Sequence, residues 1–154
     1  MTRLLPWSET CFVCGEGNPC GLHGRFEAVD GEVHLRLVID PCHDGYPGVV
    51  HGGVVSAMLD ETIGWACSVA VHRLCMTREL TVQFRRPVPS GRPLLVRGWT
   101  TGERGRLLLA AGQIEDEDGT VLARGKGSFF PLGEEESRRV LEQLKLGDRL
   151  ARLE

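Results

Sequence analysis

The chain has 154 residues, of which 42% are hydrophobic and 25% charged, and its formal net charge at pH 7 is −3. This length and composition predict one globular domain (1–154), and the small negative charge excludes an electrostatic basis for binding nucleic acid or an anionic membrane. Residues 1–8 contain no apolar run long enough for a signal peptide, so we expect a cytoplasmic protein whose six cysteines stay reduced.

The first element along the chain is an N-terminal loop over residues 1–23, marked by glycine, proline and the cysteines Cys11 and Cys14. A Cys-x-x-Cys pair is half of a zinc site, and four further side chains could in principle complete it: Cys20, His23, Cys42 and His43. No second pair with metal-ligand spacing follows, so we predict no bound metal. A zinc-held interaction domain is the structural alternative that this segment supports.

Two strand patterns follow the loop. Residues 24–29 form a weak one, and Asp30-Gly31 is typical of a hairpin turn. In the second, four apolar residues alternate with polar ones: Val33, Leu35, Leu37 and Ile39. Asp40-Pro41 ends this strand, and residues 42–45 are predicted as a loop.

The longest apolar run covers residues 53–71, and its only charged side chains are Asp60 and Glu61. A helix that is apolar all round is normally buried, so this run predicts the central helix of the domain. Its length is close to the roughly 20 residues of a membrane span, but an acidic pair at the centre would be costly in lipid. Adjacent helix residues point about 100° apart, so only one of the two carboxylates can face a given site.

Four more strand patterns come after the helix, over residues 80–84, 94–100, 106–115 and 120–130. The tail, residues 134–154, begins with three glutamates and is predicted to be helical. Its apolar stripe is formed by Val140, Leu141 and Leu144 and ends near Gly147, with Leu146, Leu150 and Leu153 beyond. Two strands, one long helix and four strands predict an α+β fold in which an antiparallel sheet wraps around one central helix.

The start of the helix, His51-Gly52-Gly53, lacks bulky side chains where backbone N–H groups are unpaired and the helix dipole is positive. Such an end can bind an anion or stabilise the oxyanion that forms when a carbonyl is attacked. Asp60 lies two turns, roughly 10 Å, beyond Gly53. If both groups serve one carbonyl, one of them comes from another copy of the chain.

These residues resemble the signature of hotdog-fold acyl-CoA thioesterases of the phenylacetyl-CoA thioesterase type, in the 4-hydroxybenzoyl-CoA thioesterase superfamily. The similarity runs over residues 11–130 and includes residues 45–50, His51-Gly52-Gly53, Asp60 nine positions after His51, and the strand at 77–87. The resemblance implies the hotdog fold and hydrolysis of a small, aromatic or medium-chain acyl-CoA. It also implies a homodimer or homotetramer that needs no cofactor or metal.

The same resemblance implies a role for four residues. Asp60 is the general base or nucleophile, the Gly53 backbone N–H holds the thioester oxygen, His51 stands beside that donor, and Thr77 helps to hold the water. The residues alone leave two alternatives: His51 as a helix-entry residue bonded to a local carbonyl, and Thr77 as an ordinary strand residue. Glu61 is expected to face away from the site and to form a cap or salt bridge. It is the reserve base if Asp60 does not face the cleft.

Other features leave the substrate and the activity open. Gly45 stands six residues before His51, where some relatives carry an Asn or Gln that helps bind the carbonyl. Side chains that could line an acyl groove are Trp65, Met58, Tyr46 and Phe84, and candidates for the coenzyme A phosphates are Arg85, Arg86, Arg124 and Lys126. The alternative functions are a hotdog acyl-CoA hydratase or dehydratase that uses His51 and Asp60, and a non-catalytic acyl-CoA-binding protein.

Overall fold

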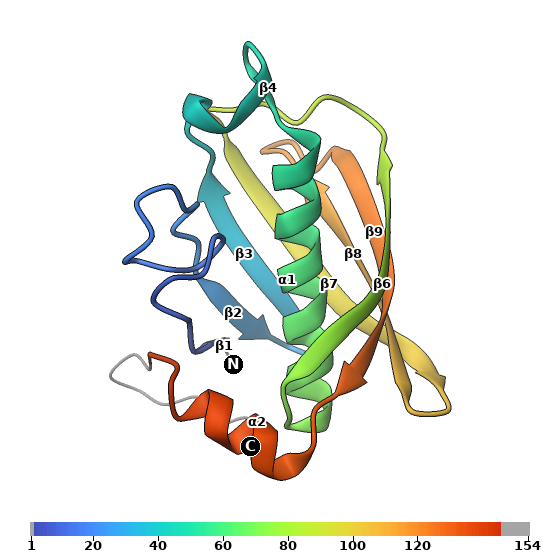
Figure 1. The fold of residues 1–154 in the computed structure, drawn as a ribbon. Coiled ribbons are helices and arrows are strands. Elements are labelled where there is room, and N and C mark those ends of the chain that lie inside the picture. Colours follow the sequence, from blue (N-terminus) through green and yellow to red (C-terminus); the bar gives the residue numbers. More distant parts are fainter. Residues whose placement is uncertain (1, 146–154) are drawn as a thin grey trace.

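A curved antiparallel sheet forms the framework of the fold in a computed structural model that describes residues 2–145. Its seven strands lie in the order β1 (Thr2–Leu4), β2 (Phe26–Val29), β3 (Glu32–Val38), β7 (Pro93–Arg104), β8 (Leu107–Glu115), β9 (Val121–Pro131) and β6 (Cys75–Phe84). The 20-residue helix α1 (Gly52–Val71) lies along one face of this sheet (Figure 1). This is the predicted arrangement, an antiparallel sheet wrapped around one long helix.

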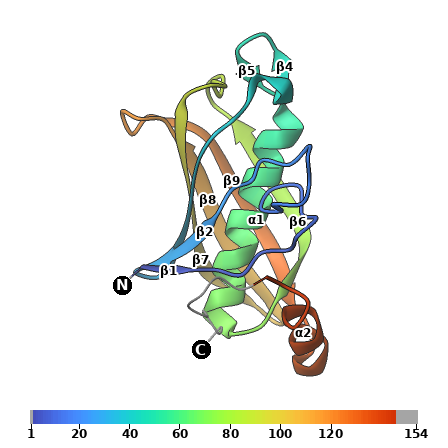
Figure 2. The ribbon, with the colours of Figure 1, turned by 90° about the vertical axis from the view of Figure 1, so that its left-hand side faces the viewer.

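The helix α1 is buried because it is covered from two sides. The sheet packs on one side, and the N-terminal loop crosses the other (Figure 2). Ten of its residues are buried, among them Met58, Leu59 and Ile63, none of which is exposed. By length and composition α1 could span a membrane, but half of the relevant stretch is enclosed within the fold. The apolar sequence of this helix is therefore accounted for by core packing.

A row of glycines brings α1 close to the sheet. Gly98, Gly112 and Gly125 are cross-strand neighbours on β7, β8 and β9. A Cβ at Gly98 would lie 2.8 Å from the Thr62 carbonyl oxygen, and one at Gly112 would lie 2.9 Å from Ile63 Cγ1. Without side chains at these positions, the helix backbone packs directly against the strands and its central residues are held at a fixed depth.

The N-terminal loop, residues 5–25, is an ordered cover on α1. Its turns are fixed by backbone hydrogen bonds, including Leu22 N–H to the Phe12 carbonyl at 2.8 Å and Gly24 N–H to the Val13 carbonyl at 2.8 Å. Val13 and Cys14 are 3% and 1% exposed, so this segment contributes to the core.

Several elements differ from the sequence-based prediction. The edge strand β1 and the small hairpin of β4 (Asp44–Tyr46) and β5 (Val49–Val50) were not predicted, and a short 3-10 helix, Pro41–His43, precedes the hairpin. These strands are two or three residues long, too short for an alternating pattern to be recognised. The predicted tail helix is present as α2 (Glu134–Leu141), whereas Leu146, Leu150 and Leu153 lie outside the described residues.

Candidate active site

Asp60 lies near the middle of α1, mostly buried, and points toward strand β6. Its Oδ1 accepts a hydrogen bond of 2.8 Å from the Thr77 hydroxyl. That bond is the one hydrogen bond to the Asp60 carboxylate within residues 2–145, so Oδ2 is available to a second donor such as water. The structure thus brings together the predicted carboxylate and the predicted hydroxyl.

Thr77 stands at an irregular point of an edge strand. The strand β6 pairs with β9 on one side only, and its register shifts between Thr77 and Glu79. Thr77 is exposed. On the side of β6 that faces away from β9, no strand lies in the described part of the chain. The Asp60–Thr77 pair is therefore located at the open edge of the sheet.

His51 caps the N-terminus of α1. Its Nδ1 accepts a hydrogen bond of 2.9 Å from the Gly53 N–H, which is the amide that the family resemblance assigns to the thioester oxygen. Because Nδ1 is an acceptor here, a neutral His51 ring carries its proton on Nε2. The Gly52 N–H donates no hydrogen bond within residues 2–145. In this conformation the available donors at the helix start are the Gly52 N–H and His51 Nε2–H, and Gly53 becomes one only if the His51 ring turns away.

Gly45 lies directly against His51. A Cβ at position 45 would be 3.2 Å from His51 Cα and 3.4 Å from its ring. A longer side chain at this position would therefore lie beside the helix start, as the resemblance implies for relatives with Asn or Gln. With glycine, this chain lacks a side-chain donor there, and the backbone amide and the histidine are left as the polar groups.

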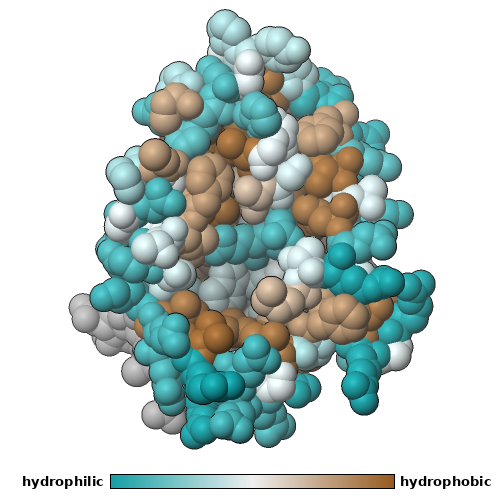
Figure 3. All heavy atoms as spheres, in the orientation of Figure 1, coloured by the Kyte–Doolittle hydropathy of each residue, from teal (hydrophilic) through white to brown (hydrophobic). Residues whose placement is uncertain are grey.

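A groove of about 580 Å³ opens at this end of the helix. It is lined by Gly45, Tyr46, Val49, Val50, His51, Gly52, Val55, Phe84, Arg85, Arg86, Pro87 and Val88. Tyr46 is 78% and Phe84 58% exposed, and apolar side chains interrupt the polar surface on the face that carries α1 and β6 (Figure 3). Of the predicted acyl-groove residues, Tyr46 and Phe84 lie in this groove, while Met58 and Trp65 belong to the core.

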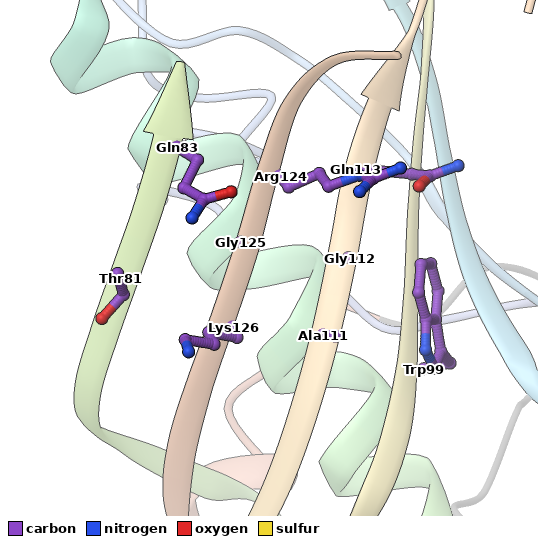
Figure 4. Close-up of a pocket in the computed structure, with 9 residues that line it drawn as sticks. All are labelled: Thr81, Gln83, Trp99, Ala111, Gly112, Gln113, Arg124, Gly125 and Lys126. Atoms are coloured by element: carbon purple, nitrogen blue, oxygen red, sulfur yellow. The ribbon is translucent and has the colours of Figure 1, made fainter. Parts of the chain in front are cut away.

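The predicted phosphate-binding cations fall into two separate groups. Arg85 and Arg86 line the groove beside His51. Arg124 and Lys126 line a hollow of about 440 Å³ on the face of the sheet opposite α1, together with Trp99 (Figure 4). The sheet separates this hollow from Asp60.

Glu61 does not form the predicted cap or salt bridge. It points away from β6 into the N-terminal loop, where its carboxyl oxygens lie 3.1 Å from Cys11 Sγ and 3.0 Å from Cys14 Sγ. Burial, followed by the nearby Cys11, raises the pKa of this carboxyl to about 8. The amino-acid sequence alone could not predict this cluster, because Cys11 and Glu61 are 50 positions apart and no local pattern links them.

Comparison with known proteins identifies the family of the chain. The model of the thioesterase superfamily matches residues 47–123, which include α1, β6 and the start of the helix. The chain belongs to the thioesterase superfamily. It is 33% identical over 90 residues to the acyl-coenzyme A thioesterase THEM4 of Xenopus laevis and 31% identical over 98 residues to that of Bos taurus. These matches cover 58% and 63% of this chain but 40% of each relative, so the chain spans about two fifths of their length.

Solved structures share the fold. The thioesterase superfamily protein RHA08564 is 32% identical, with a TM-score of 0.73 over 77% of this chain and 62% of that one. The E. coli PaaI protein from the phenylacetic acid degradation operon superposes with a TM-score of 0.66 over 73% of this chain and 81% of that one, at 17% identity. The family and the hotdog fold predicted from the sequence are confirmed, while the roles of Asp60, Gly53, His51 and Thr77 remain predictions.

Proposed function

We propose that this chain hydrolyses acyl-CoA thioesters, with Asp60 as the general base. The observation that carries the proposal is the Asp60–Thr77 hydrogen bond, which orients one of the two carboxylates of a largely apolar helix at the open edge of β6. A carboxylate in such surroundings is costly unless it is in use. The curated relatives named acyl-coenzyme A thioesterases support the same substrate class.

In the proposed reaction Thr77 donates to Asp60 Oδ1 and a water molecule donates to Oδ2. Asp60 takes a proton from the water molecule, and the water oxygen attacks the thioester carbonyl carbon. The resulting tetrahedral oxyanion collapses, the carbon–sulfur bond breaks, and coenzyme A leaves as a thiol after it receives that proton. Direct attack by Asp60 would instead break the carbon–sulfur bond, release coenzyme A as a thiolate that takes a proton from solvent, and give an acyl anhydride that water then hydrolyses.

The oxyanion is held at the N-terminus of helix α1. The Gly52 N–H and His51 Nε2–H supply the donors in the observed conformation, and the Gly53 N–H joins them if the His51 ring moves. The positive end of the helix dipole adds to this stabilisation. Gly53 lies roughly 10 Å along the same helix from Asp60, so one chain cannot present both groups to one carbonyl.

A homodimer resolves this separation. If β6 pairs antiparallel with β6 of a second copy over its full length, Cys75 stands opposite the second copy's Phe84, and Thr77 opposite its Val82. Phe84 packs on Gly52, since a Cβ on Gly52 would lie 3.5 Å from the Phe84 ring. This pairing brings the Asp60–Thr77 pair of one copy near the helix start of the other.

The dimer has a direct measurement. Light scattering at micromolar concentration is expected to give at least twice the 16.9 kDa of one chain. A monomer that is fully active would contradict the shared site.

The substrate is proposed from the groove. Phe84 and Tyr46 offer apolar surface for a small, aromatic or medium-chain acyl group, and Arg85 and Arg86 offer charge for the coenzyme A phosphates. The test is release of free thiol from a panel of acyl-CoA and aryl-CoA esters. Hydration of an enoyl-CoA without thiol release would favour a hydratase, and tight binding with neither reaction would favour a non-catalytic acyl-CoA-binding protein.

A further inference from the structure

Cys11, Cys14 and Glu61 form a cluster that the thioesterase reaction does not use. One oxygen of the Glu61 carboxyl lies 3.1 Å from Cys11 Sγ, and the other lies 3.0 Å from Cys14 Sγ. One donor atom from each of the three residues lies within 4.8 Å of the other two. The three side chains come from two elements, the N-terminal loop and the centre of α1, and converge on one point.

The loop holds the Cys11 sulfur in a defined position. Backbone N–H groups of Val13 and Cys14 point at Cys11 Sγ, at 3.3 and 3.4 Å. The turn closes with a hydrogen bond of 2.9 Å from the Gly15 N–H to the Cys11 carbonyl. A Cβ at Gly15 would lie 2.5 Å from that same oxygen, so the turn requires glycine directly after Cys14. Two N–H donors aimed at one sulfur favour its thiolate form, which is the form that binds a metal.

No cationic side chain accompanies the cluster in the described part of the chain. Within residues 2–145, no Lys, Arg or His forms an ion pair with Glu61. Cys14 is 1% exposed, and both Cys11 and Glu61 are mostly buried. Buried carboxylates are normally paired with a cation or bound to a metal. A divalent cation at the point where the three donor atoms meet would take the place of the protons on these side chains.

We propose that Cys11, Cys14 and Glu61 bind one Zn²⁺ ion, with a water molecule in the fourth position. Two thiolates select a thiophilic metal, and Zn²⁺ also accepts a carboxylate oxygen in tetrahedral geometry. Zn–S bonds of about 2.3 Å and a Zn–O bond of about 2.0–2.2 Å place tetrahedral ligand atoms roughly 3.6–3.8 Å apart. The present sulfur–oxygen contact of 3.0–3.1 Å to the ligating oxygen would therefore widen by about half an ångström. Binding releases the thiol protons to solvent.

The ion would fasten the N-terminal loop to α1. Its ligand Glu61 is adjacent to Asp60 but points to a different side of the helix, toward the loop rather than toward β6. The site is therefore structural, and it is independent of the proposed hydrolysis. The sequence alone predicted no metal because a second ligand pair was missing, whereas the fold supplies the third ligand from α1.

The test is metal binding by the full chain, stripped with a chelator, dialysed free of it and kept reduced with a phosphine. Elemental analysis after reloading is expected to give one Zn²⁺ per chain. Co²⁺ as a probe is expected to give a thiolate-to-metal absorption band that Zn²⁺ abolishes. Zn²⁺ at about 100 times its dissociation constant is expected to raise Tm by about 5 °C or more.

Variants separate this cluster from the other thiols. Cys11→Ser and Glu61→Gln are expected to weaken Co²⁺ and Zn²⁺ binding by about tenfold or more. Cys42→Ser, at an exposed cysteine outside the cluster, is the matched control and is expected to bind as the native chain does. Absence of stoichiometric Zn²⁺ and of the Co²⁺ band in the native protein would overturn the proposal. An unchanged band in Cys11→Ser would do so as well, and because Cys11 is not fully buried this variant is expected to fold.

Discussion

The Thr77 hydroxyl provides a graded test of how Asp60 is positioned. Thr77→Val keeps the shape and strand propensity of the side chain but removes its hydrogen bond of 2.8 Å to Asp60 Oδ1. A hydrogen bond to a charged group contributes about 1.5–3 kcal/mol, and the exposure of Thr77 favours the lower end. At about 1.4 kcal/mol per factor of ten, kcat is expected to fall about tenfold with KM little changed.

The assay is thiol release from an acyl-CoA, with folding checked by thermal melting. Thr77→Ser retains the hydroxyl and is expected to stay close to the native rate. Thr81→Val makes the same change on the same strand, at a residue that lines the hollow on the opposite face of the sheet, and should leave kcat unchanged. A native kcat in a folded Thr77→Val variant would refute the inference that this hydroxyl orients the base.

Two further predictions concern stability. Gly98→Ala places a Cβ 2.8 Å from the Thr62 carbonyl oxygen of α1, so urea titration should show a loss of about 1–3 kcal/mol in the free energy of unfolding. Gly64→Ala, within α1, leaves 3.5 Å to the Phe129 ring and should gain up to about 1 kcal/mol. Equal effects would contradict the close approach of helix and sheet. Hydrogen bonds from Arg97 hold the pKa of Glu32 below its usual value of 4.5. The stabilisation that Glu32 contributes is therefore fully present above its usual pKa of 4.5 and is lost as the pH falls through the lower pKa of the folded state. Glu32→Gln should flatten this part of the plot of unfolding free energy against pH.

The main elements of the fold could be predicted because their patterns are long. The apolar run of α1, the alternation in β3 and the paired strands β7 and β8 extend over enough residues for periodicity to be recognised. The hairpin of β4 and β5 could not be predicted in the same way. Its strands are too short for a pattern, and its turn is set by Asp44, whose Oδ2 accepts from the Gly48 N–H at 2.8 Å.

The site could be predicted in part. The sequence indicated Asp60 and Thr77, and the fold brings them within hydrogen-bond distance. It did not indicate that the His51 ring occupies the Gly53 N–H, although a polar residue before a helix that opens with two glycines is a possible N-cap. The contacts of Glu61 depend on which segment covers the second face of α1, which no local pattern specifies.

The most direct test of the proposed function is the rate of thiol release by Asp60→Asn. This change keeps the size of the side chain and its bond to Thr77, so the variant is expected to fold, while loss of a general base should lower kcat by about 10²–10⁴. Glu61→Gln, which points to a different side of the helix, is the paired control, and it should lower kcat by less than about tenfold. Full activity in Asp60→Asn together with loss in Glu61→Gln would contradict the assignment and make Glu61 the base.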